Sequence, residues 1–191
     1  MFAAWSRIIL FAILCPLGVG AANAQGKWYY TVFFGVMTEN RWHEVFSPGD
    51  LQLAASDLVG LGIGWDRQIA ASRFRYGFEM QALRHFGRQD HYEFNLPIVL
   101  RYVPANPVPR WLKTVAFGIG VSHATKVPQV EIDRKGESQR NFVYWMADVQ
   151  FVQRRPGTSV YFRLHHRSDG YGLYDVSSGS TALVLGWLSE F

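Results

Sequence analysis

The sequence has little cysteine and little charge. Its 191 residues include one cysteine, Cys15, and 18% of them are charged, where a soluble domain usually has about 25%. Because Cys15 lies in the N-terminal apolar segment, the rest of the chain has no thiol for a disulfide, a thiolate zinc site or a cysteine nucleophile. The formal net charge of +4 is too small to indicate binding to nucleic acid.

The first residues have the pattern of a processing segment. Arg7 gives a positive start, residues 8–19 form an apolar stretch, and Ala22, Asn23 and Ala24 make a small-residue cleavage site. The apolar stretch is too short for a transmembrane helix, which needs roughly 20 residues. We therefore expect a signal peptide over residues 1–24.

Long apolar runs are missing from the remaining chain, which excludes helical membrane spans. What is present is alternation. Even positions of residues 74–82 and 92–102 are apolar or aromatic, whereas most odd positions are polar, charged or small. A period of two predicts strands with one apolar face, which can point to lipid or into a soluble core. Glycine on the opposite face of 59–65 and 115–121 favours lipid, since a narrow barrel interior needs small residues.

The sequence divides into eight such segments, joined alternately by short and mostly longer connections. Aromatic residues cluster at their ends, as in the interfacial girdles of outer-membrane barrels, and the chain ends on Phe191, which resembles the terminal signal of that class. The segments are residues 27–37, 56–67, 72–86, 90–103, 112–124, 140–154, 158–168 and 181–191.

These features predict an all-β protein. Residues 25–191 form one closed, eight-stranded antiparallel transmembrane β-barrel in the bacterial outer membrane, with a lumen filled by side chains. Charged residues on the inward parity should pair across the lumen, because buried charges are usually paired. They are Arg75, Glu79, Glu93, Arg101, Asp148, Arg163, His165 and Arg167.

One pair of residues suggests chemistry. His166 and Ser168 continue the outward parity of residues 158–168, so they are neighbours on the outer wall, at the rim where the long connections lie. An imidazole beside a hydroxyl is the base–nucleophile pair of acyl transfer. The backbone N–H groups of residues 169–172 are candidates to stabilise an oxyanion. The residues alone equally allow a rim histidine solvated among lipid head groups.

The segment His166-Arg167-Ser168-Asp169-Gly170 resembles the His-x-Ser-Asn motif of lipid A 3-O-deacylases, which are eight-stranded outer-membrane barrels. The resemblance implies His166 as general base, Ser168 as nucleophile, and lipid A of lipopolysaccharide as substrate. We predict no cofactor and no metal site. Asp169 stands where the family has asparagine.

The orienting glutamate of that family is missing here. Its place falls on Ser180 or Thr181, of which Thr181 shares the outward parity. Asn141 and Asp175 are further candidates to orient His166. The third catalytic residue is therefore left open among Thr181, Asn141 and Asp175.

Two other functions compete with the esterase. One is a non-catalytic barrel with a structural or adhesion role. The other is a palmitoyltransferase, which would need a ligand cavity in the lumen, and the charged inward set argues against that. Residues 85–91 read as a polar outer turn, and the six histidines show no metal-ligand spacing. The sequence does not determine an oligomeric state.

Overall fold

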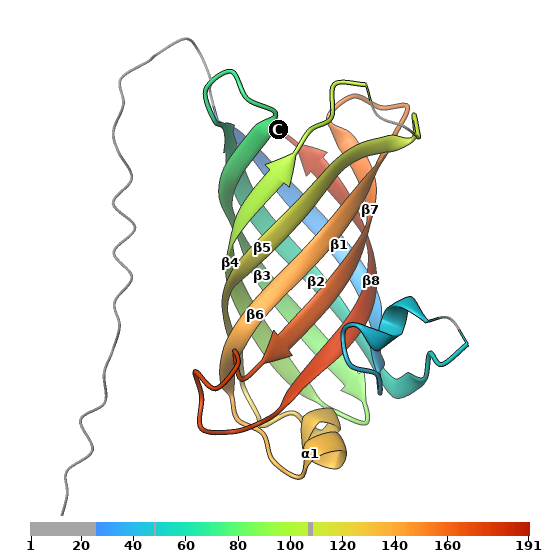
Figure 1. The fold of residues 1–191 in the computed structure, drawn as a ribbon, viewed down its shortest axis with the longest axis vertical. Coiled ribbons are helices and arrows are strands. Elements are labelled where there is room, and N and C mark those ends of the chain that lie inside the picture. The colour runs from blue at the N-terminus through green and yellow to red at the C-terminus, as the bar shows by residue number, and fades with distance from the viewer. Residues whose placement is uncertain (1–25, 48, 107–108) are drawn as a thin grey trace, which may run out of the picture.

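The computed structural model describes residues 26–47, 49–106 and 109–191, so the expected signal peptide lies outside the described residues. Eight antiparallel strands form a closed barrel, in which each strand pairs with its sequence neighbours and β1 pairs with β8 (Figure 1). They are β1 (Lys27–Thr38), β2 (Leu53–Gln68), β3 (Phe74–Gly87), β4 (His91–Tyr102), β5 (Leu112–Ala124), β6 (Asn141–Val152), β7 (Thr158–Ser168) and β8 (Gly179–Glu190).

The predicted fold class is thus confirmed, and each predicted segment coincides with one strand. Two short helices in the connections were not predicted, namely η1 (Glu44–Phe46) and α1 (Gln129–Lys135). Helix α1 ends at Gly136, whose φ of 80° lies in the left-handed region and whose N–H donates to the Ile132 carbonyl at 2.7 Å. No helix in the described ranges is long and apolar enough to cross a membrane.

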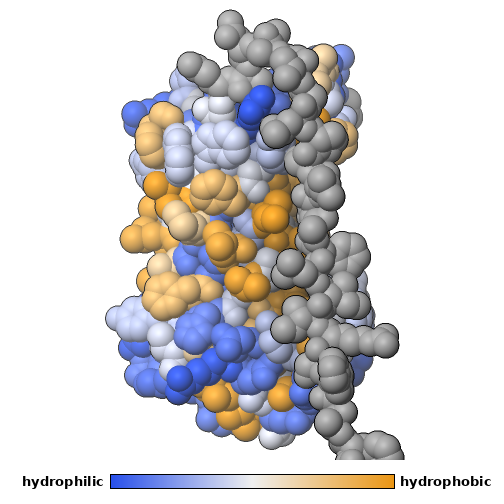
Figure 2. All heavy atoms as spheres, turned by 90° about the vertical axis from the view of Figure 1, so that its left-hand side faces the viewer, coloured by the Kyte–Doolittle hydropathy of each residue, from blue (hydrophilic) through white to orange (hydrophobic). Residues whose placement is uncertain are grey.

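The expected alternation separates the two faces of the barrel wall. On β3 and β4, Met80 and Leu96 are 47% and 49% exposed, whereas Glu79 and Glu93 are buried. Figure 2 shows one side of the result, where apolar side chains gather across the middle of the barrel between more polar ends. This is the surface expected of a barrel whose outer wall contacts lipid.

The lumen is filled by aromatic rings and paired charges. Arg163 lies at its centre and donates to Asp148 at 2.7 Å and to Glu79 at 2.9 Å. Near one end of the barrel Arg101 donates to Asp66 at 3.1 Å. Glycine makes room for the rings, since a Cβ at Gly60 would overlap the Phe33 ring. The predicted ionic core is therefore present.

The two ends of the barrel differ (Figure 1). One end, which we call the long-loop end, carries η1, α1 and the connections 39–52, 88–90, 125–140 and 169–178. The other end, which we call the short-turn end, carries the C-terminal Phe191 and the turns 69–73, 103–111 and 153–157. The candidate motif of β7 lies at the long-loop end, as predicted.

Candidate active site on the outer face of strand β7

His166 and Ser168 lie on the outer face of β7 and line one pocket at the long-loop end. The pocket has a volume of about 290 Å³. Its walls come from β6, from the connection 39–52, from α1 and from the connection 169–178, so it forms only when three loops meet. Its other lining residues include Arg41, Trp42, His43, Arg134, Lys135, Trp145, Asp169, Tyr171 and Ser178.

His166 is held between two neighbouring strands. Its register partners are Trp145 on β6 and Thr181 on β8. The Trp145 ring lies 4.8 Å from the imidazole, centroid to centroid, and the Thr181 hydroxyl lies 3.0 Å from Nδ1. His166 is consequently only 7% exposed although it points outward. With Nδ1 engaged, Nε2 is the ring nitrogen left for a proton transfer.

The three candidates for the orienting residue are now distinguished by geometry. Thr181 contacts His166. Asn141 instead lies with its side-chain oxygen 2.7 Å from Nδ1 of His123. Asp175 is exposed, and within the described ranges no hydrogen bond or ion pair joins it to His166. Thr181 is therefore the side chain positioned to orient the imidazole.

Ser168 is not hydrogen bonded to His166 in this structure. Among the hydrogen bonds of the described residues none joins the two side chains, so the direct contact expected from their spacing is not formed. The Ser168 hydroxyl instead accepts a long hydrogen bond of 3.4 Å from the N–H of Gly170. Both side chains line the same pocket. Ser168 and His166 therefore share the pocket without being hydrogen bonded to each other.

The turn after Ser168 has an unusual backbone. Gly170, Tyr171 and Gly172 have φ values of 68°, 58° and 86°, all in the left-handed region. A side chain at Gly170 would also press on Val143 of β6. The turn is closed by Asp169, whose N–H donates to the Ser178 carbonyl at 3.1 Å. This conformation brings the Gly170 N–H to the Ser168 hydroxyl.

Loop residues that no sequence pattern had indicated complete the pocket. The Trp42 ring packs edge-on against Trp145, with the centroids 5.7 Å apart. The Arg134 guanidinium donates to the carbonyls of Asn40, at 3.1 Å, and Gly179, which ties α1 to the first connection and to β8. Burial lowers the pKa of Arg134, but a guanidinium remains charged at neutral pH.

The charge around the pocket is mainly positive. Arg41, Arg134 and Lys135 contribute cationic side chains, against the single carboxylate of Asp169. Such a rim is suited to an anionic group on a ligand, such as a phosphate. Because these cationic residues lie in two separate loops, the alternation of residues along the strands could not predict that they come together.

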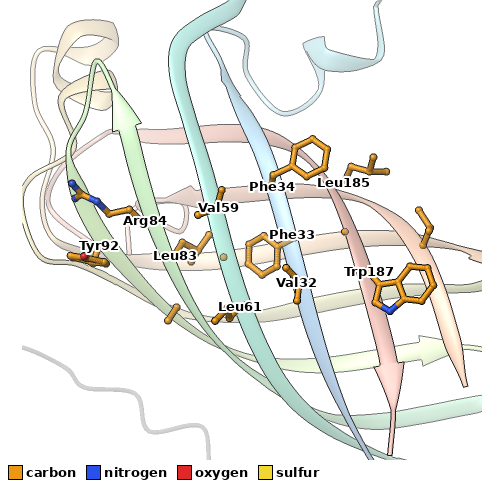
Figure 3. Close-up of a pocket in the computed structure, with 14 residues that line it drawn as sticks. Val32, Phe33, Phe34, Val59, Leu61, Leu83, Arg84, Tyr92, Leu185 and Trp187 are labelled. Atoms are coloured by element: carbon orange, nitrogen blue, oxygen red, sulfur yellow. The ribbon is translucent and has the colours of Figure 1, made fainter.

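A second and larger hollow lies on the apolar outer wall, with a volume of about 870 Å³. Figure 3 shows Phe34, Val59 and Leu185 around it, from strands β1, β2 and β8, with Arg84 and Tyr92 at one side. Apart from these two residues and Trp187, its lining is aliphatic side chains, phenylalanine and glycine. This hollow lies apart from His166 and Ser168, which do not line it.

Residues 85–91 contain the predicted turn, at 88–90, but several of their polar side chains are not on the outside. The ends of this hairpin turn inward, and His85, Gln89 and His91 are buried in the lumen. His85, His91 and Glu93 come together there closely enough to hold a metal ion. The spacing of the histidines alone did not indicate this cluster, because it depends on cross-strand pairing of β3 with β4.

Comparison with known proteins identifies a protein of similar fold but does not assign this chain to a family. No family model matches the sequence, and no curated protein matches it significantly. A solved structure is similar, the crystal structure of the outer membrane enzyme PagL, with a TM-score of 0.54 and 17% sequence identity. The match covers 84% of this chain and 98% of that one. This chain has the fold of an outer membrane enzyme.

Proposed function

We propose that this protein is an outer-membrane lipid A deacylase, which hydrolyses an acyl ester of lipopolysaccharide with Ser168 as nucleophile and His166 as general base. The observation that carries the proposal is the geometry around His166. Its Nδ1 is 3.0 Å from the Thr181 hydroxyl, and it shares one rim pocket with Ser168. The resemblance of the His-x-Ser segment to lipid A 3-O-deacylases gives the reaction class.

The apolar outer wall supports the membrane placement. Exposed apolar side chains occur on all eight strands, and on the side seen in Figure 2 they lie between more polar ends, as on the outer wall of a transmembrane barrel. In such barrels the long loops face the outside of the cell. That orientation puts the pocket at the level of the outer leaflet, where lipopolysaccharide resides. The fold shared with the outer membrane enzyme PagL agrees with it.

The chemistry follows from the positions of the side chains. With the Thr181 hydroxyl accepting from Nδ1–H of His166, Nε2 carries a lone pair. When the Ser168 side chain turns toward it, Nε2 takes the hydroxyl proton as the oxygen attacks the ester carbonyl. Collapse of the tetrahedral intermediate breaks the ester C–O bond, and His166 returns the proton to the departing sugar hydroxyl. Water then hydrolyses the acyl-serine by the same route.

The turn after the nucleophile supplies the group to stabilise the oxyanion. The Gly170 N–H already faces the Ser168 oxygen at 3.4 Å. Once the serine has rotated and reacted, this donor is available to the negative oxygen of the tetrahedral intermediate. The left-handed backbone of residues 170–172 holds it in place.

The surroundings of the pocket support the substrate class. Arg41, Arg134 and Lys135 form a cationic rim that suits the phosphates of lipid A, while the apolar outer wall next to the pocket can receive acyl chains. The resemblance to the deacylase family points to the 3-linked hydroxyacyl ester.

The test is the mass of lipid A from membranes that contain the protein. Ser168→Ala should abolish loss of the acyl chain, whereas Ser189→Ala, which removes a hydroxyl at the short-turn end of β8, should leave it unchanged. Heat-modifiable gel mobility controls for folding, and one rim hydroxyl contributes little packing. Continued deacylation by Ser168→Ala would show that the nucleophile is another residue.

A non-catalytic barrel is the second candidate, and two observations favour it. The residue that orients His166 is a threonine, which cannot stabilise an imidazolium as a carboxylate does. The Ser168 and His166 side chains are also not hydrogen bonded to each other. If the parent protein leaves lipid A mass unchanged, this second function replaces the first.

A further inference from the structure

A separate cluster of potential metal ligands lies inside the barrel, near the long-loop end. His85 on β3 and His91 on β4 are register partners next to the turn 88–90, and Glu93 is the next inward residue of β4. Their exposed fractions are 1%, 2% and 1%. One ligand atom from each of them lies within 4.8 Å of the others.

We propose that His85, His91 and Glu93 form a binding site for a divalent transition-metal ion such as Zn²⁺. Two imidazoles and one carboxylate are a common zinc ligand set, whereas Mg²⁺ and Ca²⁺ prefer oxygen ligands. The site is independent of the proposed esterase, which uses the opposite face of the barrel wall.

His91 gives the first reason to expect a ligand. Its Nε2 is buried and has no hydrogen-bond partner among the described residues. Its ring stacks on His85 with the centroids 4.5 Å apart and the planes at 15°. Buried polar atoms are nearly always paired, so a ring nitrogen left unpaired beside a carboxylate and a second imidazole calls for a further partner.

His85 gives the second reason. Its Nε2 lies 3.0 Å from Glu93 Oε2, so two of the donor atoms already converge. Its Nδ1 lies 2.9 Å from the side-chain nitrogen of Gln89, while the Gln89 oxygen is buried and has no partner in the part of the chain that the structure describes. Turning the amide over, which exchanges two nearly indistinguishable atoms, would let Gln89 accept from Nδ1–H. Metal-bound histidines commonly donate their second nitrogen in this way.

The neighbouring charges leave room for a cation. Glu93 also contacts His165 at 3.0 Å and Arg167 at 3.6 Å. Arg167 is drawn away toward α1, where its Nε lies 2.8 Å from Glu131. Its charge is therefore partly balanced elsewhere. Glu93 Oε1 also accepts from the Asn95 amide at 2.9 Å, so Oε2, 3.0 Å from His85 Nε2, is the oxygen placed to bind a metal. A bound ion would join β3 to β4 directly beneath their turn.

The experiment measures Zn²⁺ binding to the full chain, folded in detergent without a histidine tag and freed of metal by a chelator. Competition with a chromophoric zinc indicator should show one Zn²⁺ per chain and no comparable binding of Mg²⁺. His91→Phe keeps the stacked ring but removes the donor, so affinity should fall by at least about tenfold. His123→Phe, on the outer face of β5, is the matched control and should bind like the parent.

A second measurement distinguishes this site from surface binding. Zn²⁺ should raise the melting temperature of the parent and of His123→Phe but not that of His91→Phe, because only the folded lumen assembles the ligands. Equal affinity of parent and His91→Phe, or no stoichiometric binding by the parent, would overturn the proposal. Neither readout depends on ester hydrolysis.

Discussion

Strand β7 carries two neighbouring histidines, one on each face, and they differ in how many of their ring nitrogens have a partner. His165 points into the lumen, where Tyr144 lies 3.1 Å from its Nδ1 and Glu93 lies 3.0 Å from its Nε2. His166 points outward, and the Thr181 hydroxyl engages only its Nδ1. An imidazole with both nitrogens engaged stabilises the fold, while one held through a single nitrogen keeps the other for chemistry.

The same contrast extends along the strand. On the inner face Arg163 and Arg167 are buried and paired with carboxylates. On the outer face Ser168 lies beside a pocket and makes one long hydrogen bond. Substitutions on the inner face should therefore lower the stability of the barrel, whereas substitutions on the outer face should lower its activity. Variants on both faces can test this difference.

The largest effect is expected at the centre of the lumen. Arg163→Met would leave Glu79 and Asp148 buried without their common partner, and breaking a buried ion pair costs about 3–5 kcal/mol. The free energy of unfolding in detergent, followed by urea titration and gel mobility, measures it. Arg155→Met, at an exposed turn, is the control. Equal stability of both variants would show that the network contributes little.

The next comparison replaces each of the two histidines, His165 and His166, by phenylalanine. His165→Phe should destabilise the barrel by about 1–3 kcal/mol, because Tyr144 and Glu93 each lose a buried partner, and should retain deacylation in whatever protein folds. His166→Phe should cost less stability, because only the Thr181 hydroxyl loses a buried partner, and should leave lipid A intact. The reverse pattern, with activity lost in His165→Phe alone, would break the assignment of roles to the two faces.

Much of this division was predictable from the sequence, because strand parity has a simple physical cause. Alternation assigned His165 inward and His166 outward, and it predicted that Glu79 and Arg163 would be paired inside. What parity could not supply were contacts made by loops and across strands. The Trp42 ring reaches Trp145 from a long connection, and no periodic signal marks such a residue.

Two local details also lay beyond the sequence. The contact between His166 and Thr181 follows from the register of β7 with β8, which shared parity allowed but did not determine. The missing hydrogen bond between Ser168 and His166 is a matter of one side-chain rotamer and a left-handed turn at 170–172. Spacing of two along a strand brings side chains into range, but it does not fix where a hydroxyl points.

The smallest effect is expected from substitutions of Thr181, which test how His166 is oriented on the outer face. A single hydrogen bond contributes about 1 kcal/mol, so Thr181→Val should reduce the rate of deacylation about fivefold by loosening the orientation of His166. Thr181→Ser keeps the hydroxyl and should behave like the parent. Thr181→Glu supplies the carboxylate that the deacylase resemblance implies, and the rate should rise, because a carboxylate stabilises the imidazolium formed during attack. Gel mobility must confirm folding, since the position is buried. If Thr181→Val matches the parent in rate and Thr181→Glu folds without gain, the Thr181 contact has no role in orienting His166.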